Sequence, residues 1–190
     1  MTTASPPISR WPVPEIADLP EDLRTRILDV QAKAGFVPNV FLAFSHRPDE
    51  ARAFFAWHDA LLLKETGTLT KAEREMVIVA TSGANGCLYC VVAHGAILRA
   101  YAKQPQLADQ VATNYLKADL TPRQKVLLAF AMKVCTDSGS VVDEDFERLR
   151  ASPINVYVTA TNVRTGRGRV FRNAELSPEA LLASACLPTM

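Results

Sequence analysis

Two glycines, Gly83 and Gly86, interrupt a stretch that otherwise has the apolar periodicity of an α-helix. Thr70 and Glu73 form a capping box at its beginning, in which each side chain can satisfy a backbone amide of the first turn. A second helix is expected over about residues 87–101. This part of the chain is therefore predicted to fold as a helical hairpin with a pair of cysteines at the junction.

The other periodic segments also favour helices. Their ends are marked by proline at a helix start, as in Leu120-Thr121-Pro122, and by glycine after a helix, as at Gly35 and Gly67. Residues 1–16 contain four prolines, which block a helix, and are expected to form an extended arm. We therefore predict an all-α domain over residues 17–150, with helices or helical turns at 18–34, 40–44, 48–64, 104–115, 122–134 and 143–150.

The pattern changes after residue 150. Apolar residues begin to alternate with polar, β-branched ones, which is typical of a strand. Ser177 is a suitable N-cap for a last helix. Residues 151–190 are therefore expected to form a short β-hairpin and helix appendage, with strands at 155–161 and from 170, a turn at 165–168 and a helix over 177–185.

The composition restricts the broad class of protein. The 190 residues, 48% of them hydrophobic, suffice for one compact domain with an appendage. The formal net charge is only +1, with Lys and Arg interleaved with Asp and Glu, so no nucleic-acid partner is expected. The N-terminus lacks the apolar run of a signal peptide or membrane span, so we expect no membrane association and a cytoplasmic location. In that reducing compartment a close cysteine pair is more typical of catalysis or metal binding than of a structural disulfide.

Cys87 and Cys90 have the spacing of a redox-active dithiol. A thiol reacts as its thiolate, and Cys87 should lie near the start of a helix, where unpaired amides stabilise negative charge. His94 follows Cys90 by four residues, which places the imidazole and the thiol on one helical face. The hairpin can bring Glu75 towards His94, so that the carboxylate orients the ring. These four residues are our candidate catalytic site.

A structural role or a zinc site would be the simpler interpretation of the cysteine pair. Structural zinc usually has four ligands, and no second pair of Cys or His lies near in the sequence. Cys135 and Cys186 each stand alone, and His46 and His58 lie far upstream. We therefore favour redox chemistry and expect no metal or other cofactor.

Several other side chains are open to a functional interpretation but fit a structural one better. Phe55, Trp57, His58 and Tyr89 could line an access channel, yet aromatic residues at helical spacing are more often part of a core. The arginines of the appendage are expected on solvated surface rather than in a nucleic-acid site, namely Arg164, Arg167, Arg169 and Arg172.

The segment Glu75-x11-Cys87-Leu-Tyr-Cys90-x3-His94 resembles the alkylhydroperoxidase AhpD-like family, within the carboxymuconolactone decarboxylase superfamily. The Leu69-Thr70-x2-Glu73 start before this segment is part of the same resemblance. The turn Phe36-Val-Pro-Asn39 is similar to one that members of its peroxidase-related branch often have. The resemblance covers roughly residues 8–150.

This resemblance implies a thiol-dependent peroxidase with an antioxidant role, acting without haem or metal. It implies that Cys90 attacks a hydroperoxide substrate, that Cys87 resolves the intermediate, and that His94 and Glu75 form the proton relay. The electron donor would be a dithiol, of lipoyl or thioredoxin-like type, and the chain would form a homo-oligomer. Some members of the family have a second histidine between the cysteines, where this chain has Tyr89.

Residues 155–190 resemble an internal fragment of a patatin-like phospholipase, a serine lipid hydrolase. The similarity lies in the segment from Val158 to Arg167 and in Leu182-Ala-Ser-Ala-Cys-Leu-Pro188. Those enzymes need a Gly-x-Ser-x-Gly elbow and an Asp-Gly motif, and neither occurs in this sequence. The tail is thus expected to be an incomplete domain without hydrolase activity.

Two alternatives to the peroxidase remain open. The same residues could serve a dithiol-disulfide oxidoreductase that does not use peroxide. The chain could also be a non-catalytic scaffold or an inactive fusion, in which case both thiols should have ordinary pKa values. A lactone decarboxylase is disfavoured, because such relatives generally lack the cysteine pair.

Overall fold

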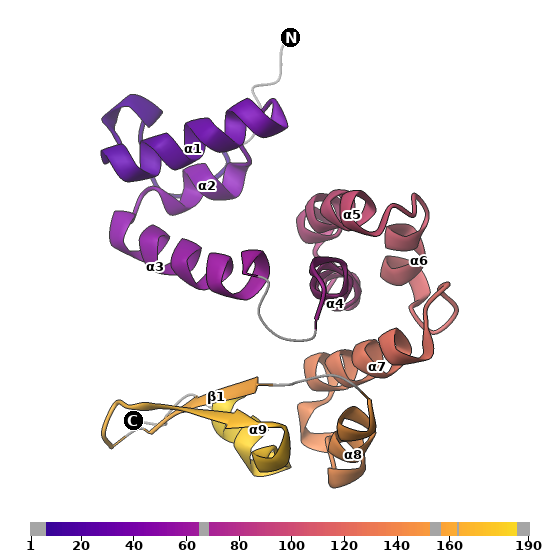
Figure 1. Cartoon of the computed structure of the whole chain (residues 1–190). Helices are drawn as coiled ribbons and strands as arrows, with labels where there is room; N and C mark the ends of the chain where they lie inside the picture. Colours follow the sequence, from indigo (N-terminus) through magenta and orange to yellow (C-terminus); the bar gives the residue numbers. More distant parts are fainter. Residues whose placement is uncertain (1–6, 65–68, 153–156, 163, 186–190) are drawn as a thin grey trace. The chain divides into compact units, whose positions relative to one another are not determined.

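The structure is a computed structural model that describes residues 7–64, 69–152, 157–162 and 164–185. The chain divides into two compact units, Met1–Lys64 and Glu65–Met190, which we describe separately (Figure 1). Most of the described residues are helical, as the sequence predicts, and the strands form one small antiparallel sheet. The first part of the predicted N-terminal arm, the cap at Gly67, the start of the strand expected at 155–161, and Cys186 lie outside the described ranges.

Unit 1 consists of helices joined by tight turns. They are η1 (Ile16–Asp18), α1 (Glu21–Ala34), α2 (Asn39–Phe44), α3 (Pro48–His58) and a π-helical turn, η2 (Asp59–Leu63). Gly35 ends α1 in the left-handed conformation, with φ of 79°, as its place in the sequence predicts. The arm before Ile16 has no helix or strand in its described part. The core of the unit is aromatic, with Leu23, Ala51 and Phe55 buried against Phe41, Phe44 and Phe54.

An ion pair connects α1 with η2 in unit 1. Both terminal nitrogens of Arg26 donate to the carboxylate of Asp59, over 2.9 and 2.8 Å. The guanidinium also lies 4.3 Å from the centre of the Phe55 ring. His58 contacts the same carboxylate through Nδ1, at 3.1 Å. The hydrogen bond from Arg26 lowers the pKa of Asp59 from 3.8 to about 2, because it stabilises the charged form.

Unit 2 begins with a helical bundle. Its helices are α4 (Lys71–Ala84), α5 (Leu88–Ala102), α6 (Leu107–Asn114), α7 (Pro122–Thr136) and α8 (Asp143–Ala151), with a 3-10 turn, η3 (Ser138–Ser140), after α7. The capping box of Thr70 and Glu73 forms as predicted, and Thr121 with Gln124 makes a second one at α7. The main core lies between α4, α5, α6 and α7, and includes Met76, Val79, Leu98, Val111 and Leu128.

The two glycines of the hairpin have different roles. Gly86 takes the left-handed conformation, with φ of 63°, and makes the turn between α4 and α5. The sequence predicts that Gly83 interrupts the helix. This prediction is wrong, because Gly83 lies within α4. A Cβ atom at Gly83 would lie 2.6 Å from the backbone oxygen of Ala112 on α6. Gly83 therefore allows a close approach of two helices.

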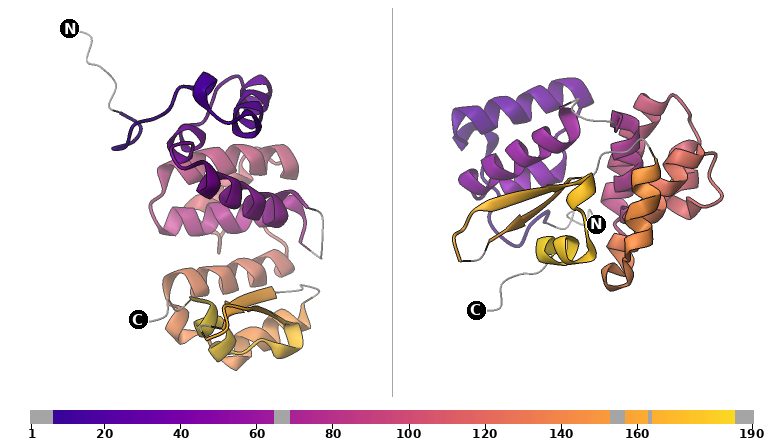
Figure 2. Two further views of the ribbon diagram at one scale, coloured as in Figure 1. Left: turned by 90° about the vertical axis from the view of Figure 1, so that its left-hand side faces the viewer. Right: turned by 60° about the horizontal axis from the view of Figure 1, so that its bottom comes forward.

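The tail forms the predicted hairpin and helix. Strand β1 (Tyr157–Thr161) pairs antiparallel with β2 (Gly168–Arg172), and η4 (Asn173–Glu175) leads to α9 (Pro178–Ala185), which packs on β1 (Figure 2). The Ser177 hydroxyl accepts a hydrogen bond from the Ala180 amide at 3.3 Å, as expected of an N-cap.

The described part of the tail also packs on the helical bundle. Arg150 at the end of α8 donates to the backbone oxygen of Leu176 at 2.9 Å. A second core of unit 2 joins side chains from the tail with side chains from α7 and α8, and comprises Val141, Phe146, Val158, Leu176 and Leu181, with Phe130, Val134 and Phe171 at its edge. The tail thus contributes buried apolar surface to unit 2, which stabilises the fold.

No helix in the described ranges is both long enough and apolar enough to cross a membrane.

Replacing Gly83 by alanine should lower the free energy of unfolding by about 1–3 kcal/mol, because the new methyl group would clash with backbone rather than with a movable side chain. Urea denaturation followed by circular dichroism measures this change. Gly139→Ala is a matched control, since a Cβ atom there meets nothing within 4 Å. Equal stability of the two variants would contradict the close contact between α4 and α6.

The Arg26–Asp59 pair should make the stability of unit 1 depend on pH in acid. The folded pKa of Asp59 lies below its ordinary value, so the stabilisation is complete above about pH 4 and is lost as the pH falls towards 2. The difference in denaturation midpoint between the wild type and Asp59→Asn should shrink over this range. Asp29→Asn, an exposed substitution on α1, should show no such trend.

Candidate active site

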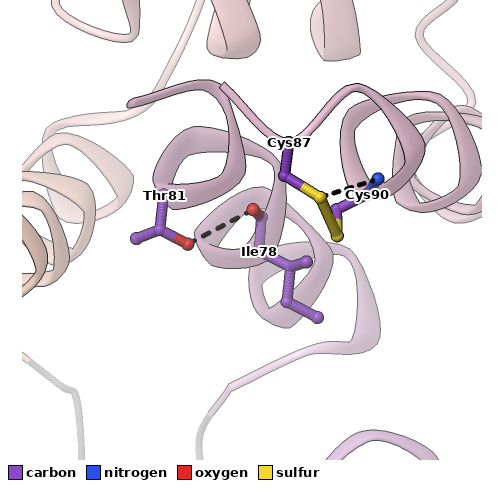
Figure 3. Close-up of a disulfide and its surroundings, with 4 residues drawn as sticks. All are labelled: Ile78, Thr81, Cys87 and Cys90. Atoms are coloured by element: carbon purple, nitrogen blue, oxygen red, sulfur yellow. Dashed lines mark hydrogen bonds between the residues drawn. A yellow bond between two sulfur atoms is a disulfide. The ribbon is translucent and has the colours of Figure 1, made fainter. Parts of the chain in front are cut away.

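The two predicted cysteines meet at the beginning of α5. Cys87 is the N-cap residue of this helix, and its amide donates to the backbone oxygen of Ser82 at 2.9 Å. Its sulfur is bonded to that of Cys90, and the two Cα atoms are 5.4 Å apart. The Cys87 sulfur also accepts a hydrogen bond from the Cys90 amide at 3.4 Å (Figure 3). The structure therefore holds the pair in its oxidised form.

The disulfide can be reached from solvent. Both cysteines are half-buried, whereas Leu88 between them is 77% exposed and Tyr89 is 46% exposed. The prediction that Trp57 and Tyr89 belong to a core is wrong, because Trp57 is also 61% exposed. Phe55 is buried as predicted. Partial burial raises the pKa of the Tyr89 hydroxyl, so this side chain is neutral near pH 7.

His94 and Glu75 form a hydrogen-bonded pair inside the hairpin. Nδ1 of His94 lies 2.8 Å from Oε2 of Glu75, and the two side chains are 22% and 7% exposed. A carboxylate can only accept, so Nδ1 carries the proton and Nε2 of the neutral ring is left as the basic nitrogen. The predicted approach of these two residues, nineteen positions apart in the chain, is thus present in the structure.

Glu73, two residues before Glu75, has a different role. Its carboxylate accepts from the Thr70 amide at 2.9 Å and pairs with Arg123 on α7. Glu73 is 3% exposed. Of the two carboxylates, only Glu73 forms the capping box. Glu75 faces the histidine instead.

A third cysteine lies near the junction and was not part of the predicted site. The side-chain amide of Asn85 donates to the sulfur of Cys135 on α7, over 3.2 Å. Cys135 has no disulfide partner and is half-buried. The sequence contains no signal for this contact, because Asn85 and Cys135 are fifty residues apart and only the packing of α7 joins them.

No group of three or more His, Cys, Asp or Glu side chains that could hold a metal ion occurs within the described ranges. The site contains a solvent-accessible disulfide on α5 and an acid-base pair between α4 and α5, in which Glu75 is buried and His94 is half-buried. This combination can exchange electrons through sulfur and protons through the imidazole.

The chain is similar to a known protein family and to solved structures. Residues 48–131 match the model of the carboxymuconolactone decarboxylase family. A solved structure described as the alkylhydroperoxidase AhpD core, an uncharacterized peroxidase-related protein from Ralstonia eutropha JMP134, is 69% identical; the match covers 77% of each chain, with a TM-score of 0.72. An uncharacterized peroxidase-related protein from Silicibacter sp. TM1040 is 36% identical, with coverage of 80% of this chain and 78% of that one, and a TM-score of 0.72.

The chain therefore belongs to the carboxymuconolactone decarboxylase family and has the helical fold of alkylhydroperoxidase AhpD-like proteins. No curated protein matches it. Neither the family match nor the names of the two structures supports a likeness of the tail to patatin-like phospholipases, which stays a prediction from the sequence.

The Glu75 contact should fix the tautomer of His94. In the wild type, nitrogen NMR should find the proton of the neutral His94 ring on Nδ1, because only that nitrogen faces a buried acceptor. Glu75→Met removes the acceptor and should abolish this preference. The signals are assigned by their loss in His94→Gln, and those of His46 and His58 are internal controls. An unchanged His94 spectrum in Glu75→Met would show that the carboxylate does not orient the ring.

Proposed function

We propose that this protein is a thiol-dependent peroxidase that reduces hydroperoxides through a dithiol-disulfide cycle of Cys87 and Cys90. The observation that carries the proposal is the juxtaposition of this bonded, accessible cysteine pair with the His94–Glu75 pair on the same helical hairpin. Membership of a family with peroxidase-related relatives supports it. No metal, haem or other cofactor is needed for such a cycle.

We assign the attack on peroxide to Cys90. In the reduced protein, Cys90 and His94 are one helical turn apart on one face of α5, so Nε2 of His94 can take the thiol proton. The Cys90 thiolate attacks the terminal oxygen of the hydroperoxide and the O–O bond breaks. The leaving alkoxide recovers the proton from His94 as an alcohol, and Cys90 is left as a sulfenic acid.

Cys87 then resolves this intermediate. Its position at the N-cap of α5 stabilises a thiolate through the helix dipole and the free amides of the first turn. The Cys87 sulfur attacks the Cys90 sulfur, an S–S bond forms, and the hydroxyl group leaves as water with the proton of Cys87. An external dithiol reduces the disulfide and is itself oxidised, so one hydroperoxide and one dithiol give an alcohol, water and one disulfide.

The donor dithiol must reach the sulfurs directly. The exposed side chains of Leu88 and Val92 beside the disulfide offer an apolar approach for a lipoyl group or a thioredoxin-like protein. A reducing compartment such as the cytoplasm would supply it. We also propose a homo-oligomer, because α5 has apolar side chains on its exposed surface, which a partner subunit can cover, including Ile97 and Tyr101.

We further propose that the domain boundaries follow the resemblance. Residues 1–16 would be an arm, residues 17–150 the AhpD-like domain, and residues 151–190 an appendage that packs on α7 and α8. The appendage has no nucleophile elbow, so it adds no hydrolase activity to the proposed function.

A disulfide oxidoreductase is the second candidate. The 77% exposure of Leu88 favours it, because a protein disulfide could approach the cysteines as closely as a small peroxide could. The same thiolates would then attack sulfur instead of oxygen. The rate of peroxide reduction compared with that of disulfide exchange separates the two functions.

Serine at either cysteine should abolish sustained hydroperoxide turnover with a dithiol donor, by at least about a hundredfold. The two variants should differ in a single turnover. Cys87→Ser should consume one equivalent of peroxide and form a sulfenic acid at Cys90, which a dimedone adduct detects by mass spectrometry. Cys90→Ser should form none.

Cys135→Ser is the matched control and should retain full turnover, since Cys135 has no disulfide partner. Peroxide consumption by Cys90→Ser would reverse the roles of the two thiols. Rapid disulfide exchange by the wild type without peroxide reduction would favour the second candidate, and the absence of both reactions would overturn the redox assignment.

A further inference from the structure

A cavity in unit 2 lies apart from the cysteine pair. Its volume is about 420 Å³, which is within the range of roughly 300–1,000 Å³ typical of small-molecule sites. It opens where the first turns of α4, the end of α5 and the start of α7 come together. Residues 72 and 84 of α4 are roughly 18 Å apart along the helix axis, and the cysteines follow the far end. The cavity is therefore not the peroxide site.

The floor of this cavity is apolar and belongs to the main core. Met76, Leu107 and Leu120 are at most 9% exposed, and all three pack in the core between α4, α5, α6 and α7. The methyl groups of Ala72 and Ala102 complete the floor, and their small size leaves the space open. An apolar body of a ligand would be buried here against rigid helices.

The rim of the cavity is polar, and part of it has no partner. Gln124 accepts a hydrogen bond from the Thr121 amide through Oε1, which leaves its side-chain NH₂ group available. Within the described ranges, no hydrogen bond or ion pair engages the carboxylate of Asp119 or the side-chain amide of Gln104. Asp119 and Gln104 are both exposed, so the rim offers a solvent-facing carboxylate and hydrogen-bonding groups above an apolar floor.

Arg123 and Lys71 have other contacts, whereas the exposed Lys103, Lys117 and Lys125 lie within two residues of a rim residue in the sequence. Arg123, beside Gln124, pairs with Glu73, and the Lys71 ammonium, beside Ala72, lies 5.7 Å from the centre of the Tyr101 ring. The ammonium group of an amine could pair with the Asp119 carboxylate, and its apolar part would fill the cavity.

We propose that this cavity binds a small amphipathic amine, with its ammonium group at Asp119 and its apolar part against Met76, Leu107 and Leu120. The site goes beyond the proposed peroxidase cycle and uses none of its residues. Because Met76 adjoins Glu75 in α4, a bound amine would rest on the same helix that holds His94 in place.

The test is an isothermal calorimetric titration of the full chain with three probes of similar shape. The probes are 2-phenylethylamine, 2-phenylethanol and 3-phenylpropionate. The amine should bind saturably, the alcohol about tenfold more weakly, and the carboxylate not at all, because only the amine forms a charge-assisted hydrogen bond with Asp119.

Asp119→Asn should weaken binding of the amine about tenfold and leave binding of the alcohol unchanged. Ala102→Leu should abolish binding of both, because the larger side chain would fill the cavity. Glu144→Gln, an exposed substitution on α8, is the charge control and should bind like the wild type. Cys90→Ser should also bind the amine normally, so the site can stand even if the peroxidase proposal fails. No saturable amine binding, or equal binding by Asp119→Asn and Glu144→Gln, would overturn the inference.

Discussion

The candidate site depends on the turn at Gly86. Its φ of 63° is accessible to glycine at no steric cost, and it lets the chain reverse between α4 and α5. Cys87 falls at the N-cap of α5 as a result, with Cys90 one turn further. The same reversal lays α5 against α4 and brings His94 to 2.8 Å from Glu75. One backbone conformation therefore positions both the sulfur pair and the acid-base pair.

The packing around α4 holds this hairpin in place. At the N-terminal end, Glu73 caps the helix and pairs with Arg123 of α7, which satisfies a buried carboxylate that would otherwise be costly. At the other end, Gly83 lets α6 approach so closely that a methyl group would not fit. Between them, Met76 and Val79 are buried in the main core. Glu75 thus projects from a helix with little freedom to move, and a rigid carboxylate keeps the imidazole in one orientation.

Sequence patterns predicted the elements well where the determining interactions are local. Three helix caps illustrate this: the capping box at Thr70, the left-handed cap at Gly35 and the N-cap at Ser177. Each involves residues within one turn, so the sequence alone predicts it. The expectations failed where the neighbours are distant. The sequence predicts a helix interruption at Gly83, whereas Gly83 lies within α4, and its contact with Ala112 is not visible in the sequence.

The prediction that Trp57 and Tyr89 are core residues is wrong for a related reason. Helical spacing shows that side chains share a face, but not whether another element covers that face. Phe55 is covered by the aromatic side chains of unit 1, whereas Tyr89 on α5 is 46% exposed. The end of α3 is a further case, since its change to a π-helical turn at Asp59 accompanies an ion pair with Arg26, thirty-three residues away.

By itself the sequence determined the helices, their caps, the β-hairpin of the tail and the four candidate residues of the dithiol site, because periodicity and short spacings fix local structure. Tertiary structure alone decided that Glu73 pairs with Arg123, that Cys135 meets Asn85, and that the tail packs on α7 and α8. It also formed the cavity beneath Asp119. Each of these features depends on which surfaces of separate helices pack against one another. That packing is determined by the burial of apolar surface over the whole core rather than by any one segment.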